Sequence, residues 1–219
     1  MSDDLRAFTD ALREWVGERL NLLAMSFYGA QDGMTARVAR DGYPLFGLLH
    51  YIIRANGCAR VLETGTARGV SAACIASAVC HRDGARVVTF DISANPERSR
   101  LWALLPAPAR SCIEPRVVDS LAGMAAAIAA GETYHAALLD SDHTEEHVWA
   151  EFQLAAQLVC QGGLILIHDA TLPGGTVAAA LDRIRGAGYG VVTLWTAEDG
   201  TPEDDGLGLA VIENRVHPC

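Results

Sequence analysis

The stretch VLETGTARGVSAACIA, residues 61–76, decides the fold of this 219-residue chain. Apolar residues lead into an acid at Glu63, glycines follow at Gly65 and Gly69, and a run of small residues begins at Ser71. This order predicts a buried strand, a tight glycine turn and a helix. The backbone N–H groups of such a turn, and the helix N-terminus after it, can approach a nucleotide-like ligand closely. The alternative is an ordinary glycine-containing turn that binds nothing.

Outward from this stretch, strand-like and helix-like segments alternate along the chain. Strands are predicted over 60–64, 85–90, 114–118, 135–139, 164–167, 190–194 and 207–212. Helices are predicted over 4–25, 45–56, 70–79, 96–105, 121–130, 145–160 and 177–185, with Gly162–Gly163 ending the sixth of them. The alternation predicts a parallel sheet covered on both faces, and the last two strands, which no helix separates, predict an antiparallel end. The predicted fold class is therefore α/β, with a seven-stranded sheet, an antiparallel C-terminal strand pair and additional N-terminal helices.

Composition favours one domain and argues against several classes of partner. Half of the residues are hydrophobic, which suits one full core, and no apolar run reaches the roughly 18 residues of a membrane span. The net charge of −10 gives no electrostatic footprint for nucleic acid or an anionic membrane. The acidic N-terminus MSDDLRAF lacks the apolar segment of a signal peptide, and the six cysteines show no C-x-x-C spacing. We therefore expect a cytoplasmic protein with reduced thiols.

Polar residues follow several of the predicted strands directly. Ligands bind outside the carboxyl ends of the strands in an open α/β sheet, so we expect these residues along one rim. They are Glu63, Asp91, Asp119 with Ser120, Asp140, and His168 with Asp169. An acid at the position of Asp91 can accept hydrogen bonds from two vicinal ribose hydroxyls. The alternative for Asp91 is a helix cap or a turn aspartate.

The sequence DSDH, residues 140–143, follows one predicted strand, and His168–Asp169 follows the next. Two carboxylates from neighbouring strand ends, with an imidazole beside them, can hold a hard divalent cation such as Mg²⁺. A cation at this place could bind a substrate hydroxyl and lower its pKa. The alternative is that Asp140 and Asp142 are turn residues and that His168 only packs.

These features resemble the class I S-adenosylmethionine-dependent methyltransferases, whose motif I has an acid before the turn and one widely spaced glycine pair. The order Glu63-x-Gly65-x-x-x-Gly69 lacks the middle glycine of the dinucleotide fingerprint G-x-G-x-x-G. The resemblance implies a Rossmann-like fold, S-adenosylmethionine as cofactor, and an adenine contact at Asp119 and Ser120, which a helix-capping role would not exclude. The implied cofactor-binding residues are Glu63, Gly65, Thr66, Gly69, Ser71, Asp91, Asp119, Ser120 and Asp140.

The segment GGLILIHDA, residues 162–170, narrows this resemblance. Together with Asp140 it is similar to the metal-dependent O-methyltransferases of the catechol and caffeoyl-coenzyme A types, and closer still to the macrocin O-methyltransferase-like group. The resemblance covers roughly residues 40–214. It implies methyl transfer to a hydroxyl of a small metabolite, such as a natural product, sugar or phenol, assisted by a divalent metal, Mg²⁺. The implied metal ligands are Asp140, His168 and Asp169, with Asp140 and Asp169 counted as catalytic.

The chain departs from the catechol type at two positions. The lysine that serves as general base three residues after the strand acid is replaced by His143, and the chain contains no lysine. An imidazole with an ordinary pKa near 6.5 can accept a proton at neutral pH, so His143 is the predicted catalytic base and His147 its alternative. His168 stands where the family often has a carboxylate, and neutral imidazole is a poorer Mg²⁺ ligand. Three roles stay open for His168: metal ligand, substrate ligand and orienting partner of Asp169.

The resemblance also divides the chain. We interpret residues 1–42 as an N-terminal helical lid and oligomerisation segment, and residues 43–219 as the methyltransferase domain. Residues 27–43 are candidates for the acceptor pocket, with Trp149 and Trp195 as further candidates, although core packing is the alternative for Trp149. The expected partners are a small hydroxylated acceptor and a second copy of the chain in a homodimer, without nucleic acid or membrane.

Three other functions stay open. A nicotinamide-dependent oxidoreductase would use a similar fold, but the missing middle glycine and the acid at Glu63 argue against it. A second alternative is a methyltransferase-like fold that only binds a ligand or partner, against which the acids at several strand ends argue. A third is a related branch of the superfamily connected with cephalosporin biosynthesis, which shares the acid-pair pattern.

Overall fold

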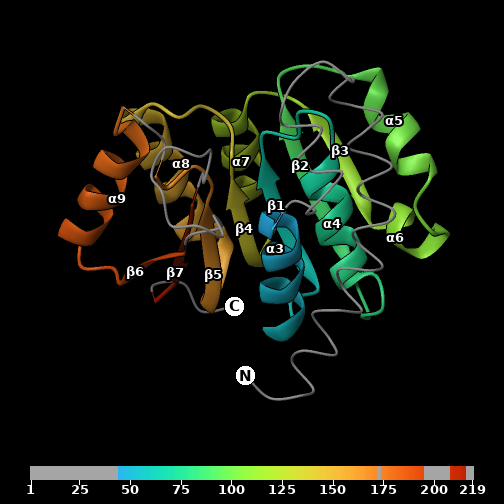
Figure 1. Ribbon diagram of the computed structural model, residues 1–219, viewed down its shortest axis with the longest axis horizontal. Helices are drawn as coiled ribbons and strands as arrows, with labels where there is room; N and C mark the ends of the chain where they lie inside the picture. The colour runs from blue at the N-terminus through green and yellow to red at the C-terminus, as the bar shows by residue number, and fades with distance from the viewer. Residues whose placement is uncertain (1–43, 172–173, 195–207, 216–219) are drawn as a thin grey trace.

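The computed structural model describes residues 44–171, 174–194 and 208–215. Within these ranges one seven-stranded sheet has the order β3-β2-β1-β4-β5-β7-β6 (Figure 1). The strands are β1 (Arg60–Thr64), β2 (Arg86–Asp91), β3 (Ile113–Val117), β4 (Tyr134–Leu139), β5 (Val159–Ile167), β6 (Val191–Leu194) and β7 (Leu209–Glu213). Strands β1 to β5 are parallel, and β7 runs antiparallel to both β5 and β6. The predicted fold class is confirmed.

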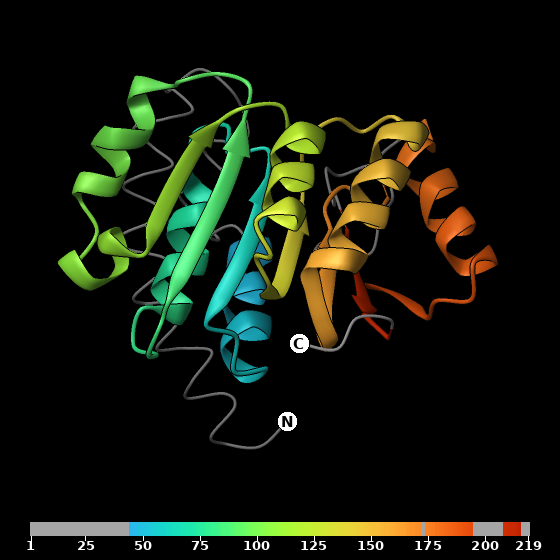
Figure 2. The same ribbon diagram turned by 180° about the vertical axis from the view of Figure 1, so that it is seen from behind.

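Helices cover both faces of the sheet. Figure 1 shows α3 (Pro44–Ala55) and α4 (Val70–Val79) in front of it, with α5 (Pro96–Ala103) and α6 (Ala107–Ser111) beyond β3. Figure 2, from behind, shows α7 (Ser120–Ala129) and α8 (Glu145–Leu158) in front, with α9 (Thr176–Gly186) beside α8. The sheet therefore separates two apolar layers, one around Ile53 and Ile75 and the other around Phe90 and Phe152.

The order of the strands reverses between β1 and β4. From β1 the chain moves outward to β2 and β3, then returns to place β4 on the other side of β1. Thr64 at the end of β1 is paired with Leu139 at the end of β4, so the two carboxyl ends are level. Such a switch point is where open α/β sheets bind their ligands, and residues 65–69 and 140–143 both begin there.

The largest deviation from the predicted elements lies at the start of β5. Gly162–Gly163 was expected to end a helix reaching Cys160, but α8 ends at Leu158 and the two glycines lie inside β5. The pairing of β5 with β4 shifts register here, which indicates a bulge. Gly162 has a φ of 78°, and a Cβ on Gly163 would lie 2.5 Å from the carbonyl oxygen of His135. The glycines are needed for this bulge and for close packing of the strands, not for a helix stop.

The short helix α6 was not predicted because prolines at 106 and 108 argue against a helix. Both lie at its N-terminal end, where proline is tolerated. Trp149 stacks on Phe152 with ring centroids 5.8 Å apart and packs against the core, so the core-packing alternative is confirmed for it.

Several predictions concern cysteines, membranes or residues outside the described ranges. Cys58, Cys74, Cys80 and Cys112 are free, whereas Cys160 is disulfide-bonded, so the expectation of six reduced thiols is wrong at that position. Among the described residues, no helix has both the length and the apolar character needed to cross a membrane. The proposed lid at 1–42 and Trp195 lie outside the described residues.

Candidate active site

The glycine turn after β1 packs directly on the chain that leaves β4. Gly65 has a φ of 78°, and a Cβ at this position would lie 1.8 Å from the carbonyl oxygen of Asp140. Gly69 has a φ of 83°, and its Cβ would lie 2.7 Å from Nε1 of Trp102, which donates a hydrogen bond of 2.9 Å to the Gly69 carbonyl. Both positions combine a left-handed backbone with no room for a side chain, so each requires glycine.

Beneath this turn lies a buried carboxyl group, Glu63, whose side chain is fully enclosed. It accepts a hydrogen bond from the Thr89 hydroxyl, which is itself 2.6 Å from the hydroxyl of Thr66. Burial raises the pKa of Glu63 to about 7; the Asp140 carboxylate adds to this rise, while the hydroxyls of Ser71 and Thr89 oppose it. The charge of Glu63 therefore changes near neutral pH.

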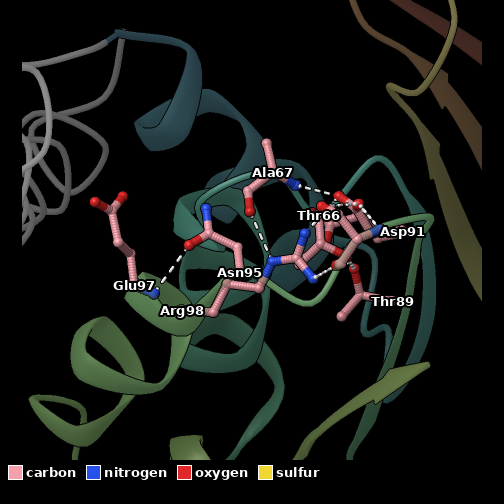
Figure 3. A network of polar contacts seen from close by, with 9 residues as sticks. Thr66, Ala67, Thr89, Asp91, Asn95, Glu97 and Arg98 are labelled. Atoms are coloured by element: carbon pink, nitrogen blue, oxygen red, sulfur yellow. Dashed lines mark hydrogen bonds and ion pairs between the residues drawn. The ribbon is translucent and has the colours of Figure 1, made fainter. Parts of the chain in front are cut away.

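Asp91, the predicted ribose ligand, is held by protein groups on both of its oxygens (Figure 3). Oδ1 accepts hydrogen bonds from the N–H and hydroxyl of Ser93 at 2.8 and 3.0 Å, and Oδ2 accepts one from the N–H of Ala67 at 2.8 Å. The guanidinium of Arg98 lies 2.6 Å from Oδ2. Burial favours the neutral acid, but the Ser93 and Ala67 hydrogen bonds and then Arg98 outweigh it and lower the pKa of Asp91. Its role as a ribose ligand stays a prediction.

Arg98 is the residue of this site that sequence reasoning missed. It is almost fully buried and also donates to the carbonyls of Ala67 at 2.6 Å and Ser93 at 2.7 Å. It thereby joins α5, the end of β2 and the glycine turn (Figure 3). The only sequence signal is its place in the first turn of a helix capped by Asn95, which does not distinguish it from an exposed arginine.

The residues that follow β3 form the N-terminal end of α7. Asp119 is the N-cap of α7 and accepts a hydrogen bond of 3.1 Å from the N–H of Ala122. The capping alternative is confirmed for Asp119, and the adenine contact stays a prediction. The hydroxyl of Ser120 lies 3.1 Å from Nε2 of His147, which also lies 3.3 Å from the buried carboxylate of Glu151. His147, the alternative base, therefore lies in a polar network with Ser120, Ser141 and Glu151, which reaches Asp140 through the hydroxyl of Thr64.

Asp140, His143, His168 and Asp169 meet in one cluster, with four ligand atoms within 4.8 Å of one another. Nε2 of His143 lies 2.9 Å from Asp169 Oδ2 and 3.5 Å from Asp140 Oδ1. Nδ1 of His168 lies 3.0 Å from Asp140 Oδ1 and 2.9 Å from Asp169 Oδ1. The predicted metal ligands Asp140, His168 and Asp169 are brought together, and the predicted base His143 lies among them.

The charges in this cluster are strongly coupled. The carboxylates of Asp140 and Asp169 raise the pKa of His143 to about 10. Burial opposes the charged form of His168, but the same two carboxylates outweigh it and raise the pKa of His168 to about 9. Burial favours neutral Asp169, yet the two imidazoles lower the pKa of Asp169 to about 2. The raised pKa values favour the protonated form of both imidazoles in the ion-free protein, and the role of His143 as the base stays a prediction.

A pocket joins the glycine turn to this cluster. Asp140 and His168 line it together with Gly65, Thr66 and Ser71. Leu209 and residues of α3 add an apolar wall.

The topology, the glycine turn at the switch point and the acids along the rim together define a class I methyltransferase fold. Residues 62–170 match the family model described as Methyltransferase domain, so the chain carries this domain over these residues.

Solved structures with a similar fold support the assignment of the methyltransferase fold. The O-methyltransferase TomG from Streptomyces achromogenes, involved in tomaymycin synthesis and solved with SAM, is similar with a TM-score of 0.65 and 17% identity, over 90% of this chain and 96% of that chain. An O-methyltransferase from Bacillus cereus solved with SAH has a TM-score of 0.63 and 17% identity, over 93% of this chain and 97% of that chain. A caffeoyl-CoA O-methyltransferase-like protein from Staphylococcus aureus has a TM-score of 0.58 and 17% identity, over 90% of this chain and 98% of that chain. No curated protein matches the chain.

Proposed function

We propose that the protein transfers a methyl group from S-adenosylmethionine to a hydroxyl oxygen of a small metabolite. The observation that carries this proposal is the single pocket that joins the glycine turn to Asp140 and His168. A donor at the turn and an acceptor at the cluster would then be neighbours. The similar structures solved with SAM or SAH, which are described as O-methyltransferases, support the choice of donor and of oxygen as acceptor.

On this proposal the rim residues bind the adenosyl group. The absence of side chains at Gly65 and Gly69 lets the backbone approach the cofactor closely, and Ser71 stands in the first turn of α4. Asp91 would receive the ribose and the Asp119–Ser120 segment the adenine. Because Arg98 and the Ala67 N–H already fix the carboxylate of Asp91, its direction is set before any ligand arrives.

Methyl transfer by direct displacement makes modest demands on the protein. An oxygen–carbon bond forms as the carbon–sulfur bond breaks, the electron pair goes to sulfur, and the acceptor loses its hydroxyl proton. The residues must align the two reactants and exclude water. The acceptor proton leaves to solvent, and a divalent cation held by Asp140 and Asp169 would lower the pKa of that hydroxyl. The predicted Mg²⁺ does not fit the two imidazoles that share this cluster, so we derive no step from Mg²⁺.

The test separates cofactor binding from chemistry. Calorimetric titration should show that the protein binds S-adenosylhomocysteine and does not bind NAD. Gly65→Ala should abolish this binding because its Cβ would meet the Asp140 carbonyl. Gly186→Ala is the matched control, since a Cβ there has no atom within 4 Å. Mass spectrometry on a panel of phenols, sugars and polyketides should then reveal a methylated product.

Tight binding of NAD in place of S-adenosylhomocysteine would contradict the proposal. Cofactor binding without turnover of any hydroxylated acceptor would favour the binding-protein alternative. The homodimer, the cytoplasmic location and the small acceptor remain part of the proposal and rest on the sequence alone.

A further inference from the structure

We infer that Asp140, His143, His168 and Asp169 form a four-ligand site for a first-row transition-metal ion such as Zn²⁺ or Co²⁺. His143 is then a metal ligand and not a free base. The inference deepens the proposed function, on which it rests only for what the ion does in catalysis. Binding of the ion depends on the four side chains alone.

The spacing of the cluster suits ligands around one ion. Zn²⁺ takes nitrogen and oxygen ligands at about 2 Å, which puts neighbouring ligand atoms about 3 Å apart. Three nitrogen–oxygen distances in the cluster are 2.9, 2.9 and 3.0 Å, and a fourth is 3.5 Å. Each imidazole lies close to both carboxylates, so the four groups surround a common centre.

The close approaches in the cluster are ion pairs that lack well-directed hydrogen bonds. Nε2 of His143, Nδ1 of His168 and Oδ1 of Asp169 are buried, and none of them has a hydrogen-bond partner. The Asp169 side chain is only 7% exposed. Each imidazole nitrogen therefore lies next to carboxylate oxygens without a well-directed hydrogen bond, which leaves these atoms open to an ion at the centre of the cluster. Buried polar atoms without hydrogen bonds call for an explanation, and an ion at the centre of the cluster would satisfy all three.

The backbone holds these ligands in fixed positions. Asp169 has a φ of 55°, an uncommon left-handed conformation for a residue other than glycine, and such strain is concentrated at functional sites. Its neighbours are clamped, because the N–H of His168 donates to the carbonyl of Leu139 at 3.0 Å and that of Ala170 to Gly208 at 3.0 Å. A rigid ligand frame loses little freedom when an ion binds.

The donor set decides the type of ion. Mg²⁺ takes oxygen ligands and keeps several waters, whereas imidazole suits Zn²⁺, Fe²⁺, Ni²⁺ and Cu²⁺. Two carboxylates and two neutral imidazoles would balance the charge of a divalent ion in this half-buried place.

The experiment measures metal binding by the full-length protein without cofactor or acceptor. After removal of metal by a chelator, Zn²⁺, Co²⁺ and Mg²⁺ are titrated separately by calorimetry, and bound metal is counted after dialysis. We expect one Zn²⁺ or Co²⁺ per chain, bound at least about tenfold more tightly than Mg²⁺. His143→Gln should weaken Co²⁺ binding at least about tenfold. His81→Gln, an exposed imidazole outside the cluster, is the matched control.

A second readout does not depend on the variant's stability. In the proton NMR spectrum of the Co²⁺-loaded wild-type protein, two ligated imidazoles should each give a strongly shifted, exchangeable N–H signal. A single shifted signal, Mg²⁺ binding as tight as that of Zn²⁺, or no stoichiometric binding of any ion would overturn the inference. Titration with S-adenosylhomocysteine is recorded separately, so failure of the methyltransferase proposal would show there and leave the metal result unchanged.

Discussion

Replacement of Arg98 by methionine should loosen the glycine turn and weaken cofactor binding. Methionine keeps an unbranched apolar side chain in this nearly buried place but removes the guanidinium that contacts Asp91, the Ala67 carbonyl and the Ser93 carbonyl. Ala67 has a φ of 43°, a left-handed conformation that costs on the order of 1 kcal/mol and needs support from its surroundings. Arg98 supplies that support from one side and Asp91 from the other.

The magnitude follows from what is lost and what remains. Breaking a buried ion pair costs about 3–5 kcal/mol, but Asp91 keeps three hydrogen bonds, so we expect a loss of about 3 kcal/mol in the free energy of unfolding. For a chain of this length the melting temperature should fall by about 6–12 °C. Because cofactor binding must then order the turn again, the affinity for S-adenosylhomocysteine should fall at least about tenfold, or about 1.4 kcal/mol.

Urea denaturation gives the free energy of unfolding, and calorimetric titration gives the affinity. Arg185→Met is the control, because its ion pair with Asp182 is exposed and such pairs contribute at most about 1 kcal/mol. Arg98→Lys should restore part of the stability through Asp91, without reaching both carbonyls. The reasoning fails if the free energy of unfolding of the methionine variant lies within about 0.5 kcal/mol of the wild-type value and the variant binds S-adenosylhomocysteine equally well. The guanidinium would then not hold the turn.

Three further predictions address the same rim. Gly69→Ala should destabilise the protein more than Gly84→Ala in urea denaturation, since both have a left-handed backbone but only Gly69 would place a Cβ against Trp102. Glu63 has its pKa raised from 4.5 to about 7, so the stability it contributes is fully present below pH 4.5 and is lost as pH rises to about 7, by about 3 kcal/mol. Glu63→Gln should therefore flatten the stability profile between pH 5 and 8, and an unchanged profile would refute the buried ionisation. Asp119→Ala should cost about 1 kcal/mol through loss of the α7 N-cap, and Asp119→Ser should recover most of it, as thermal unfolding can show.

The sequence was sufficient for those parts of the fold that depend on local chemistry. The turn between Gly65 and Gly69 could be predicted because left-handed backbone and the absence of a side chain are properties of glycine itself. The start of β5 could not, because Gly162–Gly163 forms a bulge only through pairing with β4, which is distant in sequence. The same glycine pair, considered locally, has the form of a helix stop.

The site divides in the same way. Asp140, His168 and Asp169 could be brought together from the rule that parallel strands end at one edge. The direction of the His143 ring could not, since it depends on the conformation of the segment between β4 and α8. Arg98 was hidden for a different reason: its burial follows from the packing of α5 against the glycine turn, and no local pattern separates it from the other arginines.

On the proposed function, the acids of the rim also discriminate between substrate and product. The donor carries a positive sulfonium and S-adenosylhomocysteine does not, so a pocket bordered by Asp140, with Glu63 beneath it, favours the donor electrostatically. Glu63 is the adjustable member of this pair, because its pKa of about 7 means that a nearby cation can draw off its proton at little cost. A cation at the neighbouring cluster would act in the same sense, since it would offset the charge of Asp140, which adds to the rise that burial causes in the pKa of Glu63. The occupancy of the metal cluster and the charge under the glycine turn are therefore coupled through Asp140, which packs against Gly65 and belongs to the cluster.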